Sequence, residues 1–103
     1  MIIAIDRELF RYDGVLQIFT GRDITCRKSF ICLLYTNDPV KYTCSEVSED
    51  ILNQFLRGKI DLRDVYIKYA LSLYQANEYL ELTDLEELKE TMLPSPGYYY
   101  DPS

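Results

Sequence analysis

The sequence predicts an α+β domain in which an antiparallel β-meander of three to four strands is packed by a helix–glycine–helix element. Three observations support this class. Residues 15–22, 28–36 and 40–47 alternate along the chain as strands do. The segment Ser48–Asp64 has the pattern of a helix, a glycine stop and a second helix. The segment Glu78–Glu90 carries six carboxylates and one lysine, and its end is expected to form a short acidic helix.

The N-terminal part of the chain is expected to build the meander. Residues 2–5 suggest an edge strand and residues 6–12 a helical turn, before the turn-forming pair Asp13-Gly14. Residues 28–36 are apolar on both faces, so this strand should be central and covered on both sides. Asn37-Asp38-Pro39 then forms the turn into the last strand of the meander.

The element Ser48–Asp64 carries the strongest local signals. Ser48 suits a helix N-cap, and Gly58 stands where a helix would end in a left-handed conformation. Asp61 can cap a second helix, with Asp64 three residues further on. The apolar side chains expected to face the sheet are Ile51, Leu52, Phe55 and Leu56.

The sequence beyond Asp64 leaves two interpretations open. One is a long helix that continues to about Leu80, and the other is a helix that ends near Tyr69 with a fourth strand at Leu71–Ala76. The acidic helix is expected at Leu85–Met92. Residues 1–97 are then one domain, and residues 98–103 form a tyrosine-rich tail.

Composition limits the classes of protein that the chain could represent. Its 103 residues suit a single domain, and no apolar run approaches the length of a membrane helix. The N-terminus lacks the pattern of a signal peptide, and an odd count of three cysteines is no disulfide framework. We therefore expect a cytoplasmic protein with reduced thiols and no membrane contact.

Charge and residue types exclude several activities. Residues 1–44 have a net charge of +1 and residues 45–103 a net charge of −7, which disfavours direct nucleic-acid binding. The chain has no histidine, so histidine-based triads and metal sites are excluded. Glycine-rich phosphate loops are also missing from the sequence. We expect no catalytic residue, no metal and no cofactor.

Two groups of residues are candidates for partner binding. Seven of the ten tyrosines lie at or beyond Tyr66, and the tail ends in three consecutive ones, Tyr98, Tyr99 and Tyr100. Tyrosine is enriched at interface hot spots, although these side chains could instead fold back on the core. The second group is a basic cluster around Gly58, made of Arg57, Lys59 and Arg63.

The order of motifs resembles a small bacterial domain family of unknown function. The matching segments are Tyr12-Asp13-Gly14, Cys32-Leu33-Leu34, Val47-Ser48-Glu49-Asp50, Leu56–Arg63 and Leu93–Gly97. Val15 and Glu46 stand where that family often has proline. The resemblance implies an α+β domain and favours a fourth strand at Leu71–Ala76. It brings no catalytic residue, substrate or cofactor.

These observations favour a non-enzymatic accessory module that binds a protein partner or itself through its acidic, tyrosine-rich C-terminal third. An immunity or antitoxin-like role is one version of this hypothesis. The alternatives are a small-ligand binder or enzyme with a cleft of carboxylates and tyrosines, and an acidic mimic of nucleic acid.

Overall fold

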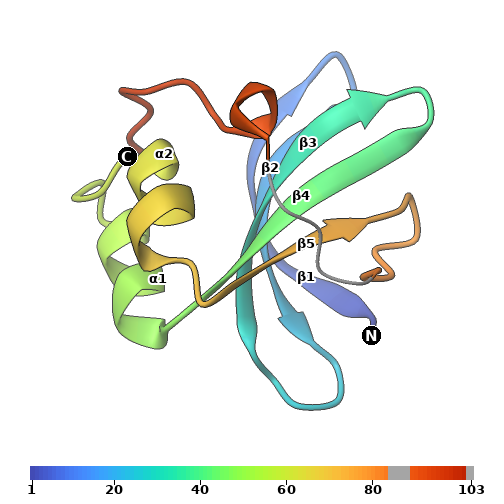
Figure 1. Cartoon of the computed structure of the whole chain (residues 1–103), viewed down its shortest axis with the longest axis horizontal. Coiled ribbons are helices and arrows are strands. Elements are labelled where there is room, and N and C mark those ends of the chain that lie inside the picture. The colour runs from blue at the N-terminus through green and yellow to red at the C-terminus, as the bar shows by residue number, and fades with distance from the viewer. Residues whose placement is uncertain (84–88, 102–103) are drawn as a thin grey trace.

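A single antiparallel sheet forms the body of the molecule. The computed structural model describes residues 1–83 and 89–101. Five strands follow one another in sequence order across the sheet, and each is hydrogen-bonded to the next (Figure 1). They are β1 (Ile3–Tyr12), β2 (Val15–Asp23), β3 (Ser29–Asn37), β4 (Val40–Val47) and β5 (Ser72–Ala76).

The predicted α+β class, with a helix–glycine–helix packing element, is wrong. The chain is nearly all-β, with about 46% strand and 20% helix. The α-helices are short, α1 (Glu49–Leu56) and α2 (Leu62–Asp64), followed directly by a π-helical turn, η1 (Val65–Tyr69). The helical region therefore covers only part of one sheet face (Figure 1).

The structure also differs from the prediction at the N-terminus. Residues 6–12 were expected to form a helical turn, but they belong to β1, a strand of ten residues. Arg7 lies opposite Thr20 and Glu8 opposite Phe19 on β2, with register shifts along the pair. Because β1 is mostly exposed, its charged residues remain in solvent while its backbone pairs with β2.

The three strands predicted from alternation are confirmed as β2, β3 and β4. The central strand β3 is covered on both faces, and Phe30, Ile31 and Cys32 are fully buried. The turn at Asn37-Asp38-Pro39 joins β3 to β4 as expected. Of the two interpretations for residues 71–76, the strand is correct, because Ser72–Ala76 pairs with β4 as β5.

The predicted caps of the helical element are also confirmed. Ser48 Oγ accepts a hydrogen bond from the Ile51 amide at 3.2 Å, and Asp61 Oδ1 accepts one from the Asp64 amide at 2.7 Å. Gly58 adopts a left-handed conformation with φ of +72°. The first half of the predicted acidic helix at Leu85–Met92, residues 85–88, lies outside the described residues, and its last residues form a 3-10 turn, η2 (Glu90–Met92).

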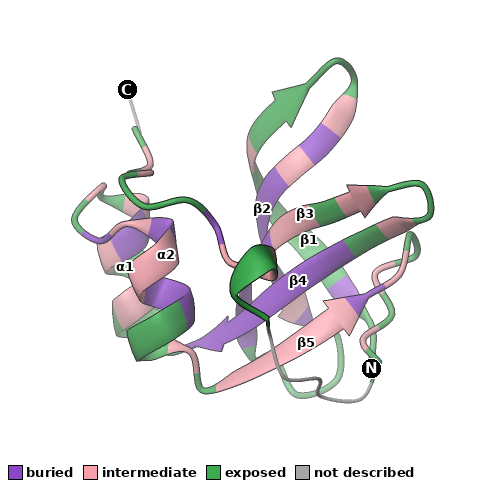
Figure 2. Ribbon diagram, turned by 45° about the horizontal axis from the view of Figure 1, so that its top comes forward, coloured by how far each residue is buried: buried purple, intermediate pink, exposed green. Residues whose placement is uncertain are grey.

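The sheet has an apolar cluster on each face. The first cluster joins the sheet to the helical region, and its buried members include Ile31, Phe55, Val65 and Tyr66. The second cluster lies on the opposite face, and its buried members include Phe19, Phe30, Cys32 and Cys44. Figure 2 shows buried residues along β2 and β4 and on the sides of the helices that face the sheet.

The two edges of the sheet meet through the residues that follow β5. The Ile3 amide donates to the carbonyl of Leu80 at 2.9 Å, and the Leu82 amide donates to the carbonyl of Met1 at 2.8 Å. The Thr83 amide donates back to Gln75 of β5 at 2.9 Å. Residues 80–83 therefore connect the start of β1 to the end of β5 and close the sheet on itself at this end.

Candidate functional site

The structure places the predicted tail tyrosines on the helical region. The Leu62 amide donates to the carbonyl of Tyr98 at 2.9 Å, and the ring of Tyr100 stacks on Phe55 with 6.3 Å between centroids. Both rings are half-buried against the first cluster, and burial raises the pKa of Tyr98. Tyr99 lies between them and is 54% exposed, so it is the tail tyrosine that remains available to a partner.

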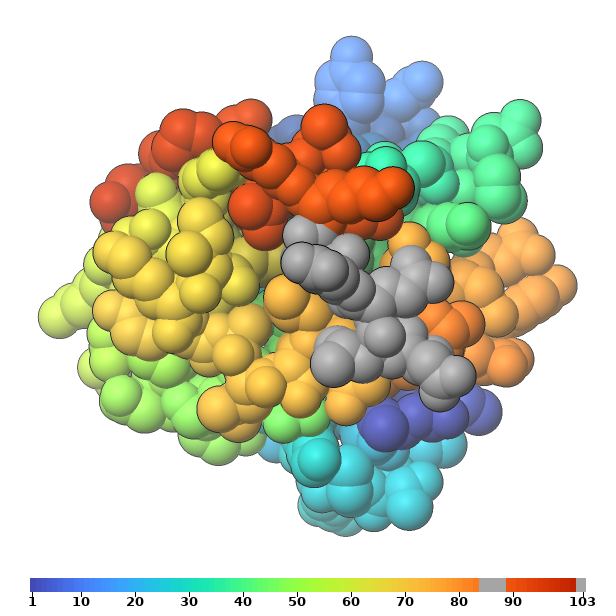
Figure 3. All heavy atoms as spheres, in the orientation of Figure 1, coloured from blue at the N-terminus to red at the C-terminus, as the bar shows by residue number. Residues whose placement is uncertain are grey.

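The predicted basic cluster is divided by the same packing. Arg63 donates to the carbonyl of Pro94 at 3.0 Å and so helps to hold the chain that leads into the tail. Arg57 and Lys59 remain exposed on either side of Gly58, which lies against the carbonyl of Tyr100. Figure 3 shows the red C-terminal residues against the yellow-green helical surface.

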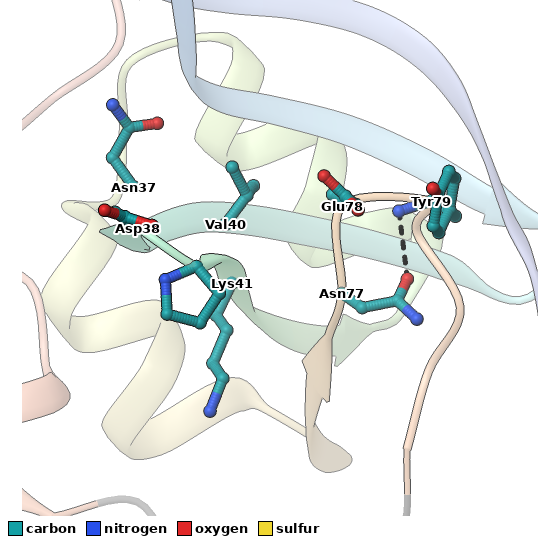
Figure 4. A pocket seen from close by; sticks show the side chains of 8 residues that line it. Asn37, Asp38, Val40, Lys41, Asn77, Glu78 and Tyr79 are labelled. Carbon is teal, nitrogen blue, oxygen red and sulfur yellow. Dashed lines mark hydrogen bonds between the residues drawn. The ribbon is translucent and has the colours of Figure 1, made fainter.

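A hollow lies between a different pair of elements. It holds about 400 Å3 and is lined by residues 37–41 of the β3–β4 hairpin and residues 77–79 of the turn after β5. We call it the hairpin–turn hollow (Figure 4). A smaller hollow of about 190 Å3 adjoins it and shares Lys41 and Asn77 with it.

The turn after β5 is held by one asparagine side chain. Asn77 Oδ1 accepts hydrogen bonds from the amides of Tyr79 at 2.9 Å and Glu81 at 3.2 Å. The Asn77 carbonyl also accepts from the Leu80 amide at 3.0 Å. These bonds fix a turn in which Tyr79 points outward and is 71% exposed.

Leu80 occupies an unusual backbone conformation at the end of this turn. Its φ is +58°, a left-handed value that is costly for a leucine. Packing against the second cluster and the bond from the Ile3 amide hold Leu80 in place. Strain of this kind persists where surrounding contacts fix the backbone.

The hairpin contributes a carboxylate, a lysine and two apolar residues to the lining. Pro39 and Val40 line the hollow, and Asp38 stands across it from Glu78 of the turn. Neither carboxylate makes a hydrogen bond or ion pair within the described ranges 1–83 and 89–101. In Figure 4 the Lys41 side chain extends away from Glu78 and Tyr79. The lining therefore holds two carboxylates without a partner among the described residues, together with the one lysine, Lys41.

Sequence reasoning missed this hollow because its two walls are 36 residues or more apart in the chain. In the sequence, Asp38 belongs to a predicted turn and Glu78 to an acidic run. The only available signal was Asn77-Glu78-Tyr79 itself, an amide, an acid and an aromatic residue directly after a candidate strand. Pairing of β4 with β5 brings this segment beside the hairpin.

The described residues offer no group of three or more Cys, Asp or Glu side chains that could hold a metal ion. Cys32 and Cys44 lie opposite each other on β3 and β4, both free and fully buried. Burial raises the pKa of Cys32 well above its ordinary value, so its thiol stays protonated. Within the same ranges, no helix has the length and apolarity needed to cross a membrane.

Comparison with known proteins adds no relationship to this description. No family model, no curated protein and no solved structure matches the chain. The chain is thus a small, nearly all-β domain with an exposed tyrosine, Tyr79, next to Glu78 at the hairpin–turn hollow.

Proposed function

We propose that the protein is a cytoplasmic, non-enzymatic module that binds a protein partner through the hairpin–turn hollow and the exposed ring of Tyr79. The observation that carries this proposal is the presentation of Tyr79. Its side chain is 71% exposed, while its backbone is fixed by the Asn77 side chain at 2.9 Å. A large aromatic ring held outward on a rigid turn loses little entropy on binding, which is the property of an interface hot spot.

The acidic character of the C-terminal part supports a basic partner. Glu78 and Glu81 flank Tyr79 in the chain and both are exposed. Residues 45–103 carry a net charge of −7, so the field on this part of the molecule attracts positive surfaces and repels nucleic acid. An immunity or antitoxin-like role is one biological form that such a module could take.

The tail surface remains a second predicted contact region. Tyr99, Arg57 and Lys59 are exposed, and Gly58, between Arg57 and Lys59 in the chain, lies against the carbonyl of Tyr100. Deletion of residues 98–103 would also remove Tyr98 and Tyr100 from the first cluster. The substitution Tyr99→Ala is therefore the sharper test of this region, since it leaves the packed tyrosines in place.

A matched pair of tyrosine substitutions tests the proposal. Tyr79 and Tyr12 are exposed to 71% and 69%, but Tyr12 lies in the β1–β2 hairpin. We expect Tyr79→Ala to lower recovery of a partner from host extract at least tenfold, while Tyr12→Ala retains it. Equal recovery with both variants would contradict the assignment of the contact to Tyr79, and a chain that captures no partner would contradict the proposed class.

A second candidate function is binding of a small ligand. The observation in its favour is that the hollow joins Asp38 and Glu78 from separate elements in a volume of about 400 Å3, within the range of ligand sites. Two results together would favour this function over protein binding. A small ligand would bind the isolated protein and lose affinity in Glu78→Gln, and partner recovery would be unaffected by Tyr79→Ala.

A further inference from the structure

The second cluster contains two thiols that face each other on neighbouring strands. Cys32 of β3 lies directly opposite Cys44 of β4, and both are free and fully buried. Directly opposed residues of an antiparallel pair share one face of the sheet, and both side chains belong to this cluster. Burial and, after it, a hydrogen bond with the Cys44 thiol raise the pKa of Cys32. The two thiols therefore lie within hydrogen-bonding reach of each other.

The spacing of such a pair permits a disulfide bond and also strains it. Opposed residues of antiparallel strands have Cα atoms about 4.5–5.5 Å apart, within the range of about 4.4–6.8 Å that disulfides span. Their Cβ atoms are about 4.5–5.5 Å apart, whereas a disulfide holds its Cβ atoms at about 3.5–4.5 Å. A bond between Cys32 and Cys44 would therefore draw β3 and β4 together, and strained disulfides are more readily reduced.

We propose that Cys32 and Cys44 form a modification site at which a small peroxide converts the two thiols into a reversible disulfide. One thiol loses its proton to water, and its thiolate attacks the peroxide, so that an S–O bond forms and the O–O bond breaks. The hydroxide that leaves takes up a proton and becomes water. The second sulfur then displaces the oxygen of the sulfenic acid, which leaves with the second thiol proton as water. The thiols lose two electrons and two protons, and the peroxide is reduced to two water molecules.

The closed sheet protects the pair, so the reaction requires local opening at β5. Both thiols are fully buried, and a buried, protonated thiol is a poor nucleophile. β5 is the shortest of the five strands and pairs with β4, where Tyr74 lies directly opposite Cys44. Opening of β5 removes Tyr74 from beside Cys44 and admits water and a small neutral oxidant. The pair should therefore react slowly, at a rate set by this opening.

The test treats the folded full chain with hydrogen peroxide and maps the products by mass spectrometry. Cys26→Ser serves as the background in every sample, because the exposed thiol of Cys26 would otherwise compete. Cleavage after Lys28, Lys41 and Arg57 places the two cysteines in separate fragments, 29–41 and 42–57. We expect these fragments to be joined in more than half of the chains, with a mass two hydrogens below their sum. Excess reduced glutathione should then separate them.

Matched variants in the same background separate the pair and its access route from general oxidation. Cys32→Ala and Cys44→Ala should each abolish the joined product. Tyr74→Ala should speed its formation at least threefold, whereas Tyr12→Ala, at an exposed position in another hairpin, should change the rate less than twofold. Circular dichroism at the assay temperature verifies that each variant is folded.

Several results would overturn the inference. The two thiols could stay reduced in excess peroxide, or each could be oxidised separately to sulfinic acid without a link. A joined product that excess glutathione leaves intact would exclude a reversible site. Equal rates in Tyr74→Ala and Tyr12→Ala would contradict access through β5. None of these outcomes depends on the proposed contact at Tyr79, which is tested by partner recovery.

Discussion

Gly58 connects the helical region to the tail through a single backbone position. Its φ of +72° is strained for any residue with a side chain, and a Cβ built there would lie 2.6 Å from the carbonyl oxygen of Tyr100. Gly14 has a similar φ of +76° with nothing within 4 Å of its Cβ position. The two glycines therefore separate the cost of backbone strain from the cost of a lost close approach.

We predict that Gly58→Ala destabilises the protein more than Gly14→Ala does. Left-handed strain should cost about 1–2 kcal/mol in both variants. The contact with Tyr100 should add about 1–3 kcal/mol in Gly58→Ala alone, because the tail must move. Urea unfolding of the two variants measures the difference, and equal losses would show that the tail does not pack on Gly58.

Asp23 is a second residue whose role is local and electrostatic. Its side chain is buried at the end of β2, and its Oδ1 accepts a hydrogen bond from the Thr25 amide at 2.8 Å. That bond lowers the pKa of Asp23 below its ordinary value, against the opposing effect of burial. The ionised form is therefore favoured in the folded state.

The lowered pKa of Asp23 makes the stability of the protein depend on pH. Because the folded-state pKa of Asp23 is lowered, its contribution is complete above the unfolded pKa of about 4 and is lost as pH falls through the folded value. We predict that the stability difference between the wild type and Asp23→Asn is largest at neutral pH and shrinks on acidification. Thermal unfolding between pH 7 and pH 2.5 measures it; a difference that grows toward low pH would have the wrong sign.

At the scale of elements, β1 shows why part of the fold could not be predicted. Leu9 and Phe10 lie among charged residues, so local periodicity gives no strand pattern for residues 6–12. Pairing with β2 decides the structure, and that is a long-range property. By contrast, residues 28–36 and 40–47 were predicted well, because burial on known faces imposes their alternation.

The candidate site was harder to predict than the strands. The caps at Ser48 and Asp61 and the glycine after the first helix are local signals, and they predict these features correctly. The three consecutive tail tyrosines are the same residue type, yet Tyr98 and Tyr100 pack while Tyr99 is exposed. The tertiary contacts with Phe55 and Leu62 make that distinction.

The tail should couple energetically to α1 through one aromatic pair. The rings of Phe55 and Tyr100 are stacked, with 6.3 Å between their centroids. We predict a coupling energy of about 0.5–1.5 kcal/mol in a double-mutant cycle of Phe55→Leu and Tyr100→Leu. Phe55→Leu combined with Tyr12→Leu serves as the control. Tyr12 is exposed and lies in another hairpin, so the stability changes of these two substitutions should add. Additivity in both cycles would mean that the tail is not docked on α1.

At the scale of the whole molecule, the two apolar clusters pack on opposite faces of the same sheet. Ile31 belongs to the cluster under the helical region, and its neighbours Phe30 and Cys32 belong to the cluster on the other face. Residues 80–83 then tie the two edges of the sheet together. A central strand that serves both clusters allows neither to be lost without the other, so the described part of the chain should unfold as one cooperative unit.

Truncation of one phenylalanine from each cluster tests this cooperativity. Phe55 and Phe30 are both fully buried, on opposite faces of the sheet. We predict that Phe55→Ala and Phe30→Ala each cost about 3–5 kcal/mol and lower the midpoint of a single transition. Phe10→Ala, at an exposed position on β1, should change stability by only about 0.5 kcal/mol. Calorimetry and far-ultraviolet circular dichroism should give the same unfolding midpoint for every variant, because β3 contributes residues to both clusters. Two separate transitions in either buried variant would show that the faces of the sheet fold independently.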